Sequence, residues 1–251
     1  MTVCLEAVPR DRETIVSSVK AAQAFPEIGL INIPDMLRFS IRSWEACGII
    51  AGAEEASRPL VPMPHIRAID FDHHAAFPHK EYFQNLGIEQ ALVIAGDPSD
   101  SIDHKEYPAE TPAFIKKLKT ELPNLKIYAA FDPYRTNIRY ELDYLKAKED
   151  AGAEGFMSQP FFDLRLLEIY AEYLEGNDVY WGISPVLSAS SRNYWESRNR
   201  AIFPKSFRPD LSWNVEFGRR VLDFCRDKGF NLYLMPIKVD LEIYLEGLFA
   251  N

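Results

Sequence analysis

Short apolar runs and longer amphipathic segments alternate about eight times along the chain. The apolar runs are rich in β-branched and aromatic residues and are too short for stable helices, which predicts strands. These strands are expected at Val3–Val8, Ile28–Ile33, Leu60–Ile69, Gln90–Ala95, Lys126–Phe131, Gly155–Ser158, Val179–Ser184 and Asn231–Pro236. The segments between them predict helices at Arg12–Ala24, Ser40–Ala51, His79–Leu86, Thr111–Glu121, Asn137–Asp150, Leu164–Leu174, Ser212–Lys228 and Leu241–Phe249.

This alternation of strands and helices predicts an α/β protein with a parallel sheet. Eight such units in 251 residues match the size of a (β/α)8 TIM barrel, with one domain over residues 1–251. A doubly wound open sheet is the competing fold. It is disfavoured because Pro9-Arg-Asp-Arg12 stands where a glycine-rich dinucleotide fingerprint would follow the first strand. In a barrel, residues at the carboxyl ends of the strands face the mouth where chemistry takes place.

Net charge and composition limit the classes of partner that this chain is expected to bind. The formal net charge of −9 and the scattered basic residues argue against a nucleic-acid surface. No apolar run approaches the roughly 20 residues that span a bilayer, and the first residues do not resemble a secretory signal. The three cysteines, Cys4, Cys47 and Cys225, lie far apart, which favours reduced thiols in a cytoplasm.

Two acidic residues are candidates for chemistry at the barrel mouth. Glu6 lies between Leu5 and Ala7 in an apolar strand, where burial would raise its pKa and suit it to act as a general acid. A structural salt bridge across the barrel is an equally good interpretation of Glu6. Asp97 ends the fourth strand after Gly96, which permits close approach of the backbone, although an Asp there is also common as a turn residue.

A second group of candidates could bind a flat ligand. The amide of Gln159 can donate to and accept from a heterocycle, and Phe161 and Phe162 could stack on it. Phenylalanine pairs after a strand are also common in cores. His65 lies inside the third strand, where an isolated His is more often a structural residue than a catalyst.

Two further features carry weaker signals. Tyr128 and Asp132 bracket the end of the fifth strand, where an aromatic ring could line a cofactor. His73 and His74 lie near acidic residues, but adjacent side chains diverge and no third ligand is clearly placed, so no metal is expected.

Taken together, these fragments resemble the methylenetetrahydrofolate reductase family along almost the whole chain. The matching segments are Leu5-Glu-Ala-Val-Pro-Arg10, Pro64-His-Ile-Arg67, Gly96-Asp97, Leu145-Lys-Ala-Lys-Glu-Asp-Ala-Gly-Ala153, Ser158-Gln-Pro-Phe-Phe-Asp163, Gly182-Ile-Ser-Pro-Val186 and Leu232-Tyr-Leu-Met-Pro236. Lys146 to Asp163 is the most specific stretch. The resemblance implies a barrel that reduces methylene-tetrahydrofolate, or a related methylene-tetrahydropterin, with NAD(P)H through FAD.

The resemblance also implies roles for individual residues. Glu6 would protonate a folate nitrogen, and Asp97 would lie by flavin and pterin. Gln159 would bind the pterin, with Phe161 or Phe162 stacking nearby. The flavin would be held by His65, Gly96, Asp97, Tyr128, Asp132, Glu141 and Lys148.

The chain departs from the family pattern on the flavin side. Ala95 replaces the Arg found before the Gly-Asp pair of many members, Ala147 replaces a basic residue beside Lys148, and Asp132-Pro-Tyr134 replaces a His-Pro-Glu run. Asn32-Ile-Pro-Asp35 replaces a glycine-rich stretch with threonine. The alternatives are therefore a flavin-independent reductase, a pterin-binding subunit that needs an electron-transfer partner, and a flavin-free lyase or methyl-group handler. A homo-oligomer is also compatible with the sequence.

Overall fold

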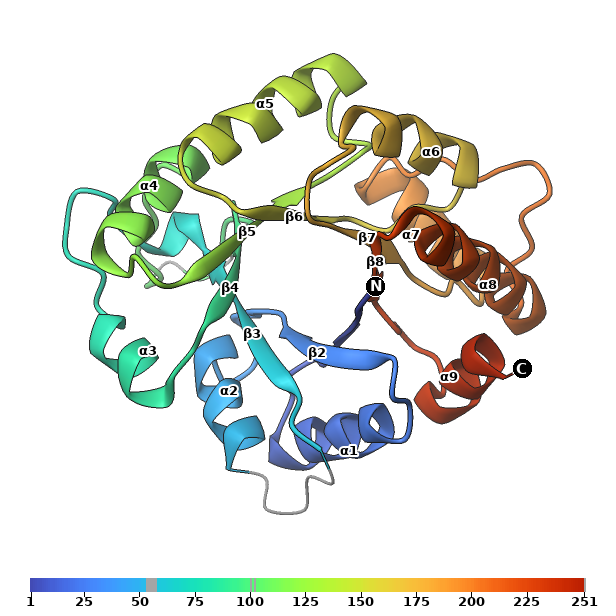
Figure 1. Cartoon of the computed structure of the whole chain (residues 1–251), viewed down its shortest axis with the longest axis horizontal. Coiled ribbons are helices and arrows are strands. Elements are labelled where there is room, and N and C mark those ends of the chain that lie inside the picture. Colours follow the sequence, from blue (N-terminus) through green and yellow to red (C-terminus); the bar gives the residue numbers. More distant parts are fainter. Residues whose placement is uncertain (53–57, 100, 102, 251) are drawn as a thin grey trace.

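The computed structural model shows a closed barrel of eight parallel strands (Figure 1) and describes residues 1–52, 58–99, 101 and 103–250. Each strand pairs with the next along the chain, and β8 closes the ring by pairing with β1. The strands are β1 (Val3–Glu6), β2 (Ile28–Ile33), β3 (Val61–Arg67), β4 (Gln90–Ile94), β5 (Lys126–Phe131), β6 (Gly155–Ser158), β7 (Val179–Ile183) and β8 (Asn231–Leu234). The predicted (β/α)8 fold is confirmed.

Helices surround the barrel on the outside (Figure 1). They are α1 (Arg12–Gln23), α2 (Ser43–Ala51), α3 (Lys80–Leu86), α4 (Thr111–Glu121), α5 (Ile138–Asp150), α6 (Leu164–Tyr173), α7 (Ala189–Arg198), α8 (Leu211–Lys228) and α9 (Leu241–Phe249), with a short 3-10 turn at Ala68–Asp70. Helix α7 was not predicted, since most of its residues are polar and Trp195 is the one that it buries.

Several helices begin at an Asp, Asn or Ser whose side chain accepts a hydrogen bond from the first turn. This contact satisfies a backbone N–H that has no partner within the helix. These N-caps are Asp11, Asn137, Asp163, Ser188, Asp210 and Asp240. The chain thus fixes the start of each of these helices locally.

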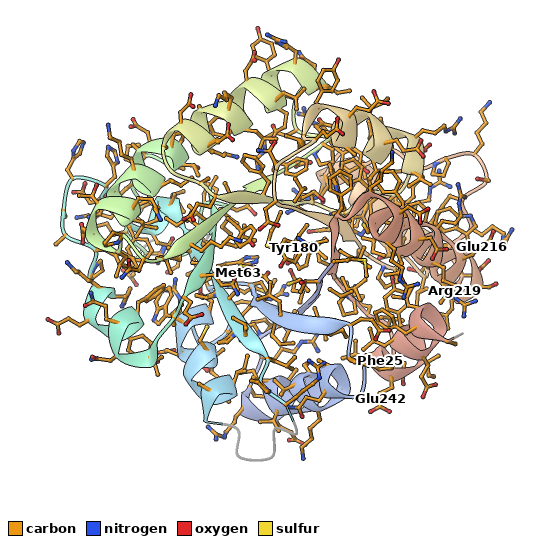
Figure 2. All side chains as sticks on the ribbon, in the orientation of Figure 1. Phe25, Met63, Tyr180, Glu216, Arg219 and Glu242 are labelled. Carbon is orange, nitrogen blue, oxygen red and sulfur yellow. The ribbon has the colours of Figure 1, made fainter. Side chains whose placement is uncertain are left out.

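The strands bury apolar side chains on both faces, as a barrel requires. Outward-facing residues pack against the helices in one large cluster. Inward-facing residues form a second cluster inside the barrel, made of Cys4, Leu30, Met63, Leu92, Tyr128, Met157, Tyr180, Tyr233 and Met235. Figure 2 shows Met63 and Tyr180 within the ring of strands, whereas Glu216 and Arg219 lie on the outer helix α8. The interior is therefore filled with side chains.

Alternation along each strand decides which polar residues reach the mouth. Successive strand residues face opposite sides, so a residue two positions after an inward-facing one also points inward, one layer nearer the carboxyl end. Cys4 and Leu30 are followed in this way by Glu6 and Asn32. A polar layer thus lies directly above the apolar filling.

No helix in the described part of the chain is long and apolar enough to cross a lipid bilayer.

Candidate active site at the carboxyl ends of the strands

Glu6 is the last residue of β1 and lies beside Asn32 of β2 in the strand register. Its side chain is partly exposed, while Leu5 and Ala7 on either side are buried. The hydroxyl group of Tyr233, on β8, is hydrogen-bonded to Glu6 Oε2. Glu6 therefore combines a fixed position with access to the barrel mouth.

Asn32 links Tyr233 to His65 beneath this carboxyl group. The amide oxygen Oδ1 of Asn32 accepts from the Tyr233 hydroxyl at 2.7 Å and is also hydrogen-bonded to His65 Nε2. Its amide nitrogen donates to the carbonyl oxygen of Met63 at 3.2 Å. Since a carbonyl can only accept, this last contact fixes which end of the amide faces Tyr233 and His65.

Burial sets the protonation of this network. It raises the pKa of Glu6 to about 7, although the hydrogen bond from Tyr233 acts in the opposite direction. Burial lowers the pKa of His65 to about 3 and raises that of Tyr233, so both are neutral near pH 7. Among the ion pairs of the described residues none includes Glu6. A carboxyl group in this setting holds a proton near neutral pH and can donate it.

Asp97 follows β4 at the same end of the barrel and is exposed. Gly96 before it has a φ of +87°, and a Cβ at this position would lie 2.6 Å from the side chain of Ile69. Only glycine fits this conformation and this space. The guanidinium group of Arg67 donates to the main-chain oxygen of Asp97 at 2.6 Å. The turn therefore presents the Asp97 carboxylate at the mouth.

Arg67 belongs to an ionic network that sequence reasoning missed. Its Nε donates to both carboxylate oxygens of Asp70 at 3.2 Å, and Asp70 also pairs with Arg42 at 3.0 Å and with His104 at 2.9 Å. Arg42 in turn pairs with the buried Asp35. Two arginines thus face two aspartates in a compact group that braces the ends of β2, β3 and β4. The clustering of charged residues just after the strands is the sequence signal that could have revealed it.

Gln159 lies directly after β6 and is partly exposed. Its backbone N–H donates to Phe131 at 2.8 Å, which extends the pairing with β5 by one residue. It is two positions beyond the inward-facing Met157, so the alternation directs it into the barrel mouth. A Cβ at Gly182 would lie 3.0 Å from the carbonyl oxygen of Gln159, so this glycine lets β7 pass close beside it.

Phe161 and Phe162 do not lie at the mouth. Both are buried, with exposed fractions of 0% and 1%. Phe161 packs edge-on against Trp181, and Phe162 stacks on Phe203 with 4.4 Å between ring centroids. Neither ring has a free face for a ligand, so the stacking role expected from the resemblance is corrected to a core role.

Tyr128 lies at the opposite end of the barrel from the mouth. Its hydroxyl donates to Asp178, which precedes β7, at 2.7 Å, and its ring meets Tyr180 edge-on. The expected position beside a cofactor is therefore wrong. The residue comes early in β5, and its length carries the hydroxyl towards the amino ends of the strands.

Glu141 and Lys148 lie on the face of α5 that packs against β5, and both are buried. Lys148 Nζ donates to the carbonyl oxygen of Ala130 at 2.6 Å, and Glu141 Oε1 accepts from the backbone N–H of Asp132 at 3.1 Å. Burial lowers the pKa of Lys148 to about 8 and raises those of Glu141 and Asp132. These contacts tie α5 to the end of β5.

Within the described residues, no group of three or more His, Cys, Asp or Glu side chains is arranged to hold a metal ion. The rings of His73 and His74 lie 4.0 Å apart, and His73 is 3.5 Å from Glu110.

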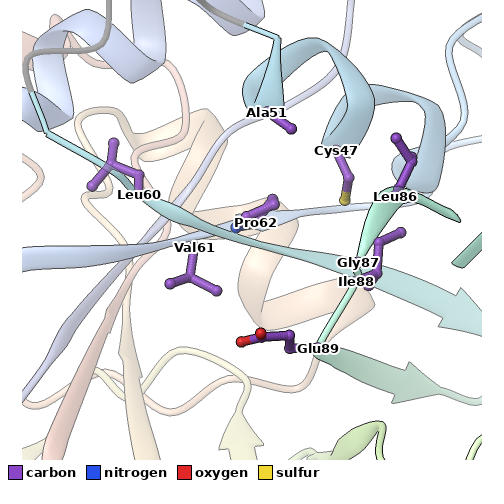
Figure 3. A pocket seen from close by; sticks show the side chains of 9 residues that line it. All are labelled: Cys47, Ala51, Leu60, Val61, Pro62, Leu86, Gly87, Ile88 and Glu89. Carbon is purple, nitrogen blue, oxygen red and sulfur yellow. The ribbon is translucent and has the colours of Figure 1, made fainter. Parts of the chain in front are cut away.

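A pocket between α2, α3 and the amino end of β3 lies away from these residues (Figure 3). Cys47, Val61, Leu86 and Glu89 are among the residues that line it. Because Val61 is the first residue of β3 and Glu89 directly precedes β4, this pocket is on the stabilising side of the barrel and is not part of the candidate site.

Comparison with solved structures gives the same architecture. An oxaloacetate acetylhydrolase bound to the inhibitor 3,3-difluorooxalacetate has a TM-score of 0.59 at 11% identity, covering 93% of this chain and 74% of its own. A 2,3-dimethylmalate lyase has a TM-score of 0.53 at 11% identity, covering 99% of this chain and 88% of its own. At such identities the likeness concerns the fold alone.

Comparison of sequences is more specific. Two proteins named 5,10-methylenetetrahydrofolate reductase, from Buchnera aphidicola subsp. Schizaphis graminum (strain Sg) and subsp. Acyrthosiphon pisum (strain APS), are 24% and 23% identical to this chain over 151 residues. The aligned part is 58% of this chain and 52% of each relative, so the chain spans about half the length of these curated relatives. The sequence profile of methylenetetrahydrofolate reductase matches residues 16–209. The chain therefore belongs to the methylenetetrahydrofolate reductase family.

Proposed function

We propose that this protein reduces the methylene group carried by tetrahydrofolate, or by a related reduced pterin, to a methyl group, with NAD(P)H as the source of hydride. The observation that carries the proposal is Glu6. In a barrel of this family, it is a half-buried carboxyl group at the mouth whose pKa is raised to about 7 without a cationic partner among the described residues. The names of the two relatives support the same reaction.

The chemistry requires an acid at this position. A methylene bridge between two nitrogens is a poor hydride acceptor, because neither nitrogen leaves readily while it is unprotonated. A proton from Glu6 on one nitrogen breaks its bond to the methylene carbon and leaves an iminium at the other nitrogen. Hydride then adds to the iminium carbon and completes the methyl group, while NAD(P)H becomes NAD(P)+. Overall one proton and one hydride are consumed.

Asp97 and Gln159 are proposed to hold the pterin. The exposed carboxylate of Asp97 can accept hydrogen bonds from the amino edge of the ring, and the amide of Gln159 can both donate and accept. Both follow strands at the same end of the barrel as Glu6. They would set the distance between the substrate nitrogen and the acid.

FAD is the cofactor that the resemblance implies, and the residues expected to hold it do not fit it as they are arranged. A diphosphate requires cations or N–H groups directed at it. Lys148, the only cation of the expected set, is 4% exposed and donates to a strand carbonyl. His65 is committed to Asn32, Tyr128 lies at the far end of the barrel, and Ala95 offers no charge. The arrangement of these residues therefore favours the flavin-independent form of the reaction.

The test combines isotope transfer with a variant of Glu6. The purified protein is incubated with deuterated NAD(P)H and methylene-tetrahydrofolate, and the mass of the product is measured by mass spectrometry. We expect one deuterium in the new methyl group, no flavin absorbance in the visible spectrum, and loss of the reaction in Glu6→Gln with an unchanged circular dichroism spectrum.

Each contrary result has a separate meaning. Product without deuterium would refute NAD(P)H as the hydride source. A stoichiometric flavin would refute the flavin-independent form but keep the reduction. Binding of folate without oxidation of NAD(P)H, restored by an added electron-transfer subunit, would make the chain a partner-dependent subunit instead.

A further inference from the structure

The Tyr233 hydroxyl has two acceptors within reach but only one proton. It contacts Glu6 Oε2 on one side and lies 2.7 Å from Asn32 Oδ1 on the other. Tyr233 is 3% exposed and lies in the barrel filling, so no bulk water competes for this proton. Which acceptor receives it must depend on the protonation of Glu6.

The orientation of Asn32 decides the pattern of donors and acceptors. Its Nδ2 donates to Met63, so Oδ1 points at Tyr233 and His65 and can only accept. The neutral ring of His65 supplies one donor from Nε2, which leaves the other lone pair of Oδ1 for the Tyr233 hydroxyl. When Tyr233 donates to Asn32, its own oxygen can accept only from a protonated Glu6. The proton order is then Glu6 to Tyr233 to Asn32.

We propose that Tyr233, aligned by Asn32, is a positioning residue that holds the acid in each of its two states. While Glu6 carries its proton, Tyr233 accepts from it and donates to Asn32. Once Glu6 has given its proton away, the Tyr233 hydroxyl turns about its C–O bond and donates to the new carboxylate. This inference rests on the proposed function, since it concerns the same general acid.

The step balances without any other reactant. The proton leaves the Glu6 oxygen for the substrate nitrogen, whose bond to the methylene carbon breaks. No proton leaves Tyr233, Asn32 or His65, and the carboxylate gains one hydrogen bond from Tyr233 as Asn32 loses one. A carboxylate formed at a half-buried position is costly unless it is hydrogen-bonded, so the turn lowers the energy of the state after proton transfer.

Several ionisable groups surround Glu6 and bear on its titration. Tyr233 on β8 contacts it directly, and Cys4 lies two residues before it on β1. His65 on β3 reaches it through Asn32 on β2. Burial keeps all three neutral near pH 7, raising the pKa of Cys4 and Tyr233 and lowering that of His65. None of the three therefore offsets the burial of Glu6 with a charge, and the hydrogen bond from Tyr233 is the contact that favours its ionised form.

The deciding experiment measures the pKa of Glu6 in the free protein by NMR of ¹³C-labelled glutamate carboxyls, with Glu6→Gln used to assign the signal. Tyr233→Phe removes the donor that stabilises the carboxylate, so the pKa should rise by about 1 unit. Asn32→Leu removes the competing acceptor, leaves Tyr233 free to donate to Glu6 permanently, and should lower the pKa. Tyr180→Phe is the matched control, because it deletes another hydroxyl of the barrel interior, and it should leave the Glu6 titration unchanged.

Opposite shifts in the two variants support the proposal, and equal shifts or none would overturn it. If Asn32→Leu does not fold, the wild type decides. The ¹³Cζ signal of Tyr233 should then change with the same midpoint as the Glu6 carboxyl, and a constant signal would overturn the two-position hydroxyl.

Activity separates this proposal from the proposed function. Tyr233→Phe should lower kcat by roughly 10- to 100-fold with little change in KM, and should move the alkaline limb of the pH profile upward with the Glu6 pKa. If the NMR shifts appear but the activity profile ignores them, the hydroxyl switch stands and Glu6 is not the acid of this reaction.

Discussion

Two groups of buried ionisable side chains lie at the carboxyl ends of the strands, one around Glu6 and one between β5 and α5. In the part of the chain that the structure describes, Glu6 contacts neutral partners, Tyr233 and, through it, Asn32 and His65. Lys148 instead faces Glu141, so each charge is partly offset by the other.

The difference separates the proposed general acid from a pair of residues that tie α5 to β5. In both groups burial disfavours charge, but at Glu6 only a neutral hydroxyl offsets that penalty, and the pKa rises to about 7. In the second group Lys148 and Glu141 are hydrogen-bonded to the backbone of β5 and of the loop that follows it. Glu6 also keeps access to the mouth, while Lys148 and Glu141 are both 4% exposed. Under the proposed function, burial alone does not distinguish the acid; burial combined with access to the mouth, and with no ion-pair partner among the described residues, does.

The same substitution, Glu to Gln, made in each of the two groups tests whether they differ in function. Glu6→Gln should lower the rate of methylene reduction by roughly 10²–10⁴-fold, the usual contribution of a general acid. Glu141→Gln should keep the activity within an order of magnitude, because its carboxylate contacts a backbone N–H behind β5. Steady-state assays of both variants at pH 7, after matching their folded fractions by circular dichroism, provide the measurement. Equal losses of activity in the two variants would show that Glu141 contributes to the active site and that the two groups do not differ in this respect.

A smaller effect is expected when Lys148 is changed. Lys148→Met retains the apolar stem but removes one of the two cations, Lys148 and Arg135, that lower the pKa of Glu141, and it leaves the carbonyl oxygen of Ala130 without this donor. We expect a loss of about 1–3 kcal/mol in the free energy of unfolding, the usual cost of leaving a buried polar group without its hydrogen-bond partner. Urea unfolding followed by tryptophan fluorescence measures it.

The double variant Glu141→Leu with Lys148→Met sharpens the result. Removing both charges should recover part of the lost stability, because Glu141 is no longer buried without Lys148. The carbonyl oxygen of Ala130 and the N–H of Asp132 still lack their side-chain partners in the double variant. A double variant as unstable as Lys148→Met would show that the hydrogen bond to β5, and not the charge pair, holds α5 in place.

The sequence pattern was sufficient for the barrel because apolar strands and amphipathic helices are encoded locally. Every predicted strand exists, with ends shifted by a few residues, as at Leu60–Ile69, which became β3 over Val61–Arg67. Helix α7 was not predicted because its mostly polar residues show no periodic apolar face. Its start is fixed by the N-cap Ser188. Local pattern thus predicts elements that bury a face and misses those that do not.

The candidate site was predictable in part. Glu6 was expected from an acidic residue in an apolar strand, and the structure gives it the raised pKa that this position implies. Asn32 and Tyr233 were given no role of their own, because their contacts join β2 to β8 across the barrel closure. Tyr128 was misplaced for another reason, since the direction of its side chain depends on its position within β5. Phe161 follows β6, and its burial against Trp181 depends on packing that joins distant segments. Counting two positions on from Leu30 would have placed Asn32 at the mouth.

The smallest predicted effect concerns stability and pH, and it tests Glu6 without any substrate. Its folded pKa of about 7 lies above the ordinary value of 4.5, so between these values the unfolded chain releases a proton that the folded protein retains. The free energy of unfolding must then fall as the pH rises from 4.5 to 7, and Glu6→Gln lacks this term. The variant should match the wild type at pH 4.5 and exceed it at pH 8 by about 1–2 kcal/mol, a 2.5-unit shift discounted for partial exposure. His65 destabilises both proteins equally at acidic pH, since its folded pKa of about 3 is unchanged by the substitution, and its effect cancels in the difference.

Urea titrations of the two proteins across this range provide the check. A constant difference would mean that Glu6 ionises in the folded protein as it does in the unfolded chain, and the contrast with Lys148 and Glu141 would then rest on exposure alone.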